Sequence, residues 1–173
     1  MIYVLGYTNV SVLNGGLKEW KRRNYKLEPD ENFYIETAFS SAENQSFFVG
    51  KEQTLRSMND KNCFLINALT SDIHKGESTR YGRPGRIPSS INIPFSDLMD
   101  INTHMLKSPK EALSTFEKHK ITQDSEILNY CGGGIAATLN AFVLRQLGFE
   151  KLKVYDNSLS EWAMDKSLPM EID

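Results

Sequence analysis

The hydrophobic positions in the second half of the chain fall into short continuous runs separated by stretches with helical spacing. The run CFLINAL at 63–69 has the length and composition of a strand buried on both faces, and EILNY at 126–130 has the same character. Strands are expected at 63–69, 90–94, 126–130 and 151–156, helices from about residue 51, after Ser108 and over 135–147, and a long polar loop over 70–89. Because strands and helices alternate, the pattern predicts an α/β fold with a mostly parallel central sheet.

The two ends of the chain repeat each other. Residues 5–20 and 147–162 align at an offset of 142 residues without a gap, with six identities in 16 positions. Each copy is expected to contain a helix-ending glycine, a short strand, a turn and the start of a helix. Residues 5–20 are therefore expected to be the end of a unit that the chain later contains whole.

This repeat divides the chain into three expected parts. Residues 1–28 are expected to be the remnant of the end of a preceding domain, residues 29–50 a connector, and residues 51–173 a complete domain. The apolar side chains of the remnant need a surface to cover them, which either the complete domain or a partner subunit can supply. The remnant is therefore the part of the chain through which a homo-oligomer could form.

The composition of the chain excludes several classes of partner. Its 173 residues include 20 basic and 22 acidic ones, so the net charge of −2 gives no footprint for nucleic acid or an anionic membrane surface. No apolar run approaches the roughly 20 residues that span a bilayer. The two cysteines, Cys63 and Cys131, lie in different sequence settings, so we expect free thiols in the reducing cytoplasm.

The chemistry concentrates in the segment NYCGGGIAAT, where Cys131 directly follows a predicted strand. Three glycines and a predicted helix come next, so the sulfur is expected at the carboxyl end of the sheet, where open α/β folds bind ligands. The glycines at 132–134 let successive backbone N–H groups turn inward as a nest for an anion. These amides and the helix dipole favour a thiolate, which makes Cys131 the candidate nucleophile. Cys63, inside an apolar strand, is expected in the core.

Three kinds of site use a cysteine or glycine loop between a strand and a helix. A phosphate-binding P-loop needs Gly-Lys-Ser/Thr at its end, where this loop has Ile-Ala-Ala. A phosphatase of the Cys-x5-Arg type needs an arginine at position 137, which is alanine here. Sulfur transfer through a persulfide ringed by loop N–H groups needs neither feature and fits best. His74, His104 and His119 lie far apart among polar residues, so we expect them at the surface and expect no metal and no bound cofactor.

Three segments carry a family resemblance: YCGGGIAA at 130–137, YGRPGRIPSSINIP at 81–94 and VYDNSLSEW at 154–162. They resemble the carboxyl-terminal catalytic domain of tandem rhodanese-like sulfurtransferases, the thiosulfate and 3-mercaptopyruvate sulfurtransferases, and residues 5–20 resemble the end of the family's non-catalytic first domain. The resemblance implies a doubly wound domain whose central parallel sheet is flanked by helices on both faces. It also implies that a small donor passes a sulfane sulfur to a cysteine persulfide, from which a thiol or cyanide accepts it.

The resemblance also assigns the site residues. Cys131 matches the family nucleophile, and the active-site loop after it comprises Gly132, Gly133, Gly134, Ile135 and Ala136. Arg83 matches an arginine that resembles the substrate-anion contact of the mercaptopyruvate branch. Arg80 and Arg86 are similar candidates.

Several positions depart from the family pattern. Asn67 and Leu69 stand where the family usually has Asp-x-Arg, whose aspartate organises the cysteine loop, so Asn67 is a further candidate site residue. Gly132 lacks the basic side chain of thiosulfate-preferring members, Gly133 lacks the hydroxyl of the mercaptopyruvate type, and Arg86 replaces a histidine. The missing charged and hydroxyl groups leave the donor undetermined. They also leave a second interpretation open, a non-catalytic rhodanese-like regulatory or sulfide-sensing module.

Overall fold

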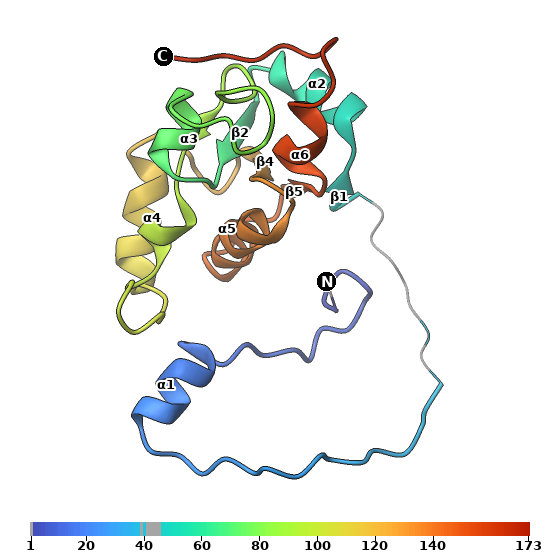
Figure 1. Cartoon of the computed structure of the whole chain (residues 1–173), viewed down its shortest axis with the longest axis vertical. Helices are drawn as coiled ribbons and strands as arrows, with labels where there is room; N and C mark the ends of the chain where they lie inside the picture. Colours follow the sequence, from blue (N-terminus) through green and yellow to red (C-terminus); the bar gives the residue numbers. More distant parts are fainter. Residues whose placement is uncertain (1, 39, 41–45) are drawn as a thin grey trace.

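Five parallel strands form the centre of the computed structural model, which describes residues 2–38, 40 and 46–173 (Figure 1). The strands are β1 (Phe48–Val49), β2 (Cys63–Asn67), β3 (Ile91–Asn92), β4 (Glu126–Tyr130) and β5 (Leu152–Tyr155). Their order in the sheet is β1-β5-β4-β2-β3, and every pairing is parallel. The predicted α/β fold with a central parallel sheet is therefore confirmed.

Helices connect these strands. They are α1 (Gly16–Arg22), α2 (Lys51–Met58), α3 (Ser71–Lys75), the 3-10 helix η1 (Phe95–Leu98), α4 (Pro109–Glu117), α5 (Ile135–Gln146) and α6 (Ser158–Trp162). A capping box between Ser108 and Glu111 fixes the start of α4. The expected loop over 70–89 contains α3, and its five residues are too few to show a helical pattern in the sequence.

The two faces of the sheet carry separate hydrophobic clusters, because successive side chains of a strand point to opposite sides. On one face, Leu65 and Leu128 pack with Trp162 of α6 and with α2. On the other face, Ile66 and Ile127 pack in a cluster with side chains of α4 and α5, including Phe116 and Leu144. Helices therefore cover both faces of the sheet, as the resemblance implies.

Residues 2–38 form an arm that contains α1 and passes beside α5 and the loop before α4 (Figure 1). Two matched positions of the repeat share a left-handed backbone conformation: Gly6 and Gly148 have φ of 94° and 91°, and Gly16 and Ser158 have φ of 57° and 50°. The strand expected in the first copy is wrong, since residues 7–13 form no strand. A strand needs a neighbour for its hydrogen bonds, which β5 finds between β1 and β4 and the arm does not find.

The arm contacts the domain at α5 and at the loop before α4. Arg145 of α5 donates to the hydroxyl of Tyr3 at 2.9 Å, and the N–H of Leu106 donates to the side chain of Asn14 at 2.8 Å. Most of its large apolar side chains are exposed: Ile2, Tyr3, Tyr7, Val10, Val12, Leu13, Leu17, Tyr25, Leu27, Phe33, Tyr34 and Ile35. The division at residues 28 and 50 stays a prediction, and residues 1, 39 and 41–45 within it lie outside the described part.

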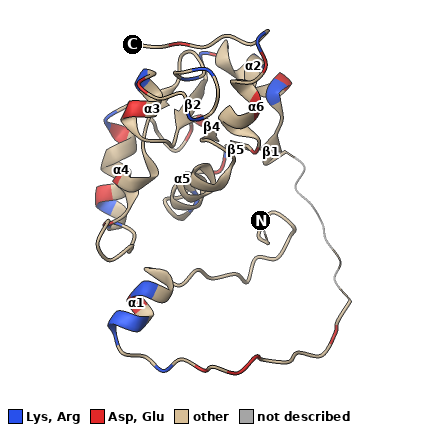
Figure 2. Ribbon diagram, in the orientation of Figure 1, with Lys and Arg blue, Asp and Glu red and all other residues tan. Residues whose placement is uncertain are grey.

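The surface charges are interspersed, with basic side chains densest on α1 (Figure 2). There Glu19 accepts hydrogen bonds from Arg22 at 2.6 Å and Arg23 at 2.8 Å, so part of this basic charge is neutralised locally. Among the described residues, no helix combines the length and the apolar character that crossing a membrane requires.

Candidate active site

Cys131 lies at the carboxyl end of β4 and only 2% of it is exposed. Tyr130, just before it, is fully buried, and its hydroxyl lies 2.6 Å from Ser90 Oγ and accepts the N–H of Ile87 at 3.2 Å. The end of the strand is thereby fixed. Gly134, with φ of 83°, then turns the chain into α5, so the cysteine, the glycine loop and the helix start follow one another as predicted.

The backbone N–H groups of residues 132–137 have no hydrogen-bond acceptor in the described part of the chain. The carbonyls of the same loop are occupied, since Leu159 donates to Cys131 O at 3.1 Å and Ser160 donates to Gly132 O at 2.8 Å. Six consecutive donors at a helix start next to a cysteine form a place where a negative charge would be stabilised.

Two of the three loop glycines are required by their surroundings. A Cβ on Gly132 would lie 2.2 Å from the ring of Tyr81, and one on Gly134 would lie 2.7 Å from the carbonyl oxygen of Asp156. Gly134 also has the positive φ that favours glycine. A Cβ on Gly133 would meet nothing closer than Ser160 Oγ at 3.9 Å, so this position has room for a side chain.

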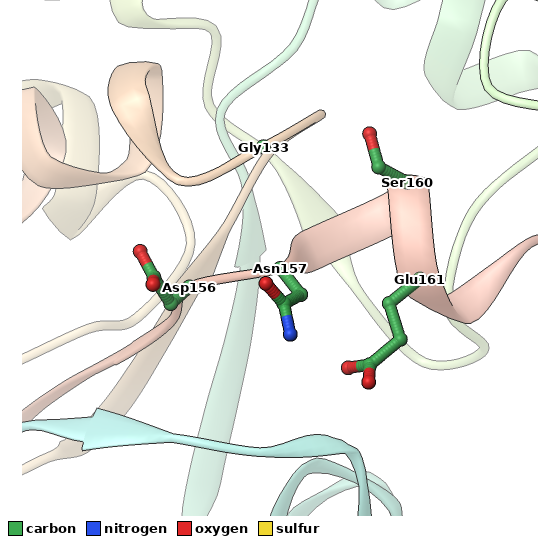
Figure 3. A pocket seen from close by; sticks show the side chains of 5 residues that line it. All are labelled: Gly133, Asp156, Asn157, Ser160 and Glu161. Carbon is green, nitrogen blue, oxygen red and sulfur yellow. The ribbon is translucent and has the colours of Figure 1, made fainter.

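An open cavity of about 280 Å³ adjoins the loop (Figure 3). Its lining consists of Gly133, Asp156, Asn157, Ser160 and Glu161, so the segment after β5 supplies every side chain in it. Tyr155 donates to Glu161 at 2.6 Å, and burial together with this carboxylate raises the pKa of Tyr155. The cavity wall thus carries two carboxylates next to the cysteine loop.

Arg83, expected to contact the substrate anion, binds the protein's own backbone. Its guanidinium donates to Ala163 O and Leu168 O at 2.8 Å each, to Asp165 O at 2.7 Å and to Trp162 O at 3.1 Å. These are carbonyls at and after the end of α6. The donors that an anion would use are therefore engaged in holding the carboxyl-terminal segment.

The other two arginines differ from each other. Arg86 is buried, donates to Asp173 at 2.6 Å, pairs with Glu171, and so anchors the carboxyl-terminal residues. Arg80 is exposed and stacks on the ring of Tyr81, with its guanidinium carbon 5.6 Å from the ring centre. The ring of Tyr81 also lies against Gly132. Arg80 is therefore next to a residue that contacts the cysteine loop.

Asn67 ends β2 beside Tyr130 and contacts a histidine. Its Oδ1 accepts the N–H of Leu69 at 3.0 Å, which leaves its Nδ2 to donate to His74 Nδ1 at 3.2 Å. The expectation of a surface histidine is wrong for His74, which is 9% exposed, because α3 places it against Asn67 at the end of β2. Burial, with the charge of Arg86, lowers the pKa of His74 to about 4.

Cys63 differs from its expected core position, since it is only partly buried at the amino end of β2. Burial still raises the pKa of its thiol. Among the described residues, no group of three or more His, Cys, Asp or Glu side chains could hold a metal ion.

Sequence reasoning missed three features beside Cys131. Tyr81 covers the loop, Ser158 accepts the Cys131 N–H at 3.0 Å, and the residues after β5 line the cavity. The signal was available in the segment VYDNSLSEW at 154–162, which starts at the end of the strand next to β4. Parallel neighbouring strands end at the same edge of a sheet, so residues that follow β5 must lie beside those that follow β4.

A parallel sheet with a cysteine and a glycine loop between a strand and a helix defines a class of α/β domains that hold an anion against backbone amides. The chain belongs to the rhodanese-like domain family, whose pattern matches residues 52–165. It is 29% identical over 170 residues to 3-mercaptopyruvate sulfurtransferase of Mus musculus and 29% identical over 174 residues to that of Escherichia coli K12. It is 26% identical over 163 residues to thiosulfate sulfurtransferase of Gallus gallus.

The alignments cover 95%, 99% and 94% of this chain but 56%, 61% and 56% of those relatives. The chain therefore spans somewhat more than half the length of the sulfurtransferases that it matches. Among solved structures, wild-type EanB superposes with a TM-score of 0.86 over 98% of this chain and 42% of its own. The Chlorobium limicola anaerobic ergothioneine biosynthesis enzyme with trimethyl histidine gives 0.87 over 98% and 43%. At 21% identity, both show the shared fold.

Proposed function

We propose that this chain transfers a sulfane sulfur from a small donor, thiosulfate or 3-mercaptopyruvate, through a persulfide on Cys131 to a thiol or cyanide. The observation that carries this proposal is the run of N–H groups at 132–137, directly after the cysteine, for which the described residues supply no acceptor. A persulfide places a negatively charged sulfur beyond Sγ, and amide donors stabilise such a charge without a counter-ion. The sulfurtransferase names of the relatives support the same reaction class.

The reaction has two balanced steps. The Cys131 thiolate attacks the donor sulfur and an S–S bond forms, while the bond from that sulfur to the rest of the donor breaks and its electron pair leaves as sulfite or as the pyruvate enolate. With 3-mercaptopyruvate, the enolate takes up the thiol proton. The acceptor then attacks the outer sulfur, and the S–S bond breaks to restore the thiolate.

Arg80 is the proposed contact for the anionic part of the donor. It is exposed and lies over the ring that covers Gly132, whereas Arg83 and Arg86 are engaged by carbonyl and carboxylate oxygens. A guanidinium suits sulfonate and carboxylate groups because its N–H donors match their geometry. We also propose a cytoplasmic setting, since unpaired thiols suit a reducing compartment.

Intact mass spectrometry tests the proposal. Incubation with thiosulfate or 3-mercaptopyruvate is expected to add one sulfur, about 32 Da, to the protein, and cyanide is expected to remove it. Cys131→Ser should abolish the adduct, whereas Cys63→Ser should keep it. The absence of an adduct with either donor and with polysulfide would refute the reaction.

A second candidate function is a non-catalytic sulfide-sensing or regulatory module. The observation that favours it is the pair of carboxylates, Asp156 and Glu161, in the cavity beside the loop, which repel a dianionic donor. Such a module is expected to take sulfur from neutral or singly charged polysulfide and to show no turnover with cyanide. Sustained thiocyanate production would exclude it.

A further inference from the structure

Ser158, the first residue of α6, holds an unfavourable backbone conformation. Its φ is 50°, in the left-handed region, and it is fully buried. Left-handed conformations are unfavourable for residues with a Cβ, and glycine adopts them freely. The matching position of the first repeat copy, Gly16, is a glycine with φ of 57°. The presence of serine instead of glycine at 158 therefore indicates that the side chain of Ser158 makes an interaction that offsets the backbone strain.

The hydroxyl of Ser158 joins the ends of two neighbouring strands. It donates its single proton to the carbonyl of Tyr155 at 2.6 Å, at the end of β5. The oxygen then accepts the N–H of Cys131 at 3.0 Å, just after the end of β4. Because the proton is committed to Tyr155, the lone pairs of the oxygen face Cys131, and the direction of this bond is fixed.

The next two residues of α6 also hydrogen-bond to the cysteine loop. Leu159 donates to Cys131 O at 3.1 Å and Ser160 donates to Gly132 O at 2.8 Å. In a trans peptide the C=O and the following N–H point in opposite directions, so these bonds turn the N–H groups of Gly132 and Gly133 away from α6. The first turn of α6 thus orients the peptide groups on both sides of Cys131.

We propose that Ser158 is a positioning residue for Cys131: its hydroxyl fixes the peptide before the cysteine, so that the thiolate and the loop amides keep one arrangement. The role is built on the proposed sulfur transfer, but it concerns the cysteine itself. Without the hydroxyl, the buried Cys131 N–H has no acceptor and the peptide rotates to find one. The sulfur then loses its fixed place relative to the loop donors.

Two substitutions separate the hydroxyl from the backbone strain. Ser158→Ala removes the hydroxyl and keeps the strain, whereas Ser158→Gly removes both. If the conformation alone matters, Ser158→Gly should equal or exceed the wild type. If the hydroxyl positions Cys131, both variants should form the persulfide about 10-fold to 100-fold more slowly at saturating thiosulfate, and the two should resemble each other. Ser57→Ala, which removes another buried hydroxyl, from α2, serves as the control.

A second measurement needs no sulfur donor. The rate of Cys131 alkylation by iodoacetamide is recorded across pH in the wild type, both Ser158 variants and Ser57→Ala, in a Cys63→Ser background. The Ser158 variants are expected to show a pH profile displaced from that of the wild type, and Ser57→Ala is expected to overlie it. Overlying profiles for Ser158→Gly and the wild type would overturn the proposal. If the wild type forms no persulfide, the sulfur transfer fails, and this profile still decides the role of Ser158.

Discussion

The ring of Tyr81 occupies the space that a side chain on Gly132 would fill, since a Cβ at that position would lie 2.2 Å from Tyr81 Oη. The two residues come from different segments, one from the loop after α3 and the other from the cysteine loop. The absence of a basic side chain at 132 therefore has a steric reason in this chain. The Arg80 guanidinium also stacks on the ring of Tyr81, so Tyr81 contacts both the proposed anion-binding arginine and the cysteine loop.

Gly132→Ala is expected to displace Tyr81 and slow persulfide formation at least about 10-fold, because overpacking typically costs about 1–3 kcal/mol. At this chain length, each kcal/mol also lowers Tm by about 2–4 °C. Gly133→Ala, whose Cβ meets nothing closer than 3.9 Å, should lose clearly less in both measurements. Equal losses for the two alanines would show that Tyr81 moves aside freely.

A double substitution tests whether the steric conflict is specific. In Gly132→Ala with Tyr81→Ala, the ring that meets the new Cβ is gone, so the losses of the two single variants should not add. Additive losses in rate and in Tm would show that Gly132 and Tyr81 do not interact. Tyr81→Phe supplies the control, since it keeps the ring and removes only the hydroxyl.

Replacing Arg83 by alanine is expected to lower stability, whereas replacing Arg80 by alanine is expected to weaken donor binding. Arg83→Ala removes four hydrogen bonds to carbonyls near the end of α6, so it should lower the free energy of unfolding by about 2 kcal/mol or more. Arg80→Ala removes an exposed cation, so Tm should stay near the wild-type value while KM for thiosulfate rises about 3-fold to 10-fold. Thermal melts and steady-state kinetics on the same preparations check both. A rise in KM for Arg83→Ala at unchanged Tm would reverse the two roles.

The sequence predicted features that depend on neighbouring residues and missed those that depend on contacts between residues far apart along the chain. The strand at 126–130 and the start of the next helix at 135 were predictable, because an apolar run and a glycine turn are local signals. The role of Arg83 was not, since its acceptors lie 79 to 85 residues further along the chain. The position of Cys131 followed from local sequence, but its partner Ser158 follows only from the order of strands in the sheet.

His74 predicts a pH dependence of stability. Burial and the nearby Arg86 lower the pKa of His74 to about 4 from 6.5, while Asp173 and Glu171 oppose that shift. Between these values the unfolded chain binds more protons, so this contribution to stability is complete above pH 6.5 and is lost as the pH falls toward 4. Replacing the histidine by glutamine, His74→Gln, should flatten the decline in Tm between pH 6.5 and 4.5. An unchanged slope would assign the decline to other groups.

Asn67→Asp tests the same pair from the other side. Asn67 donates to His74 Nδ1, which requires a neutral ring, whereas an aspartate at 67 would accept a hydrogen bond from a charged ring and stabilise it. The pKa of His74 should therefore rise in this variant, and NMR titration of the imidazole measures it directly. The decline in Tm on acidification should then be smaller than in the wild type, because the pKa of His74 in the folded state lies closer to its value in the unfolded chain. A His74 titration that does not move would show that the carboxylate turns away from the ring.

The arm predicts self-association of the full chain. Its apolar side chains, including Val12, Leu13 and Leu17, are 64%, 57% and 57% exposed, whereas Val154 and Leu159, which match Val12 and Leu17 in the repeat, are buried. Exposed apolar surface of this extent favours association, so light scattering should give a mass that rises above 19.7 kDa with concentration. Val12→Ser with Leu17→Ser should lower that mass at equal concentration and leave Tm nearly unchanged, because neither side chain is buried. A concentration-independent mass of 19.7 kDa for the wild type would contradict association through the arm.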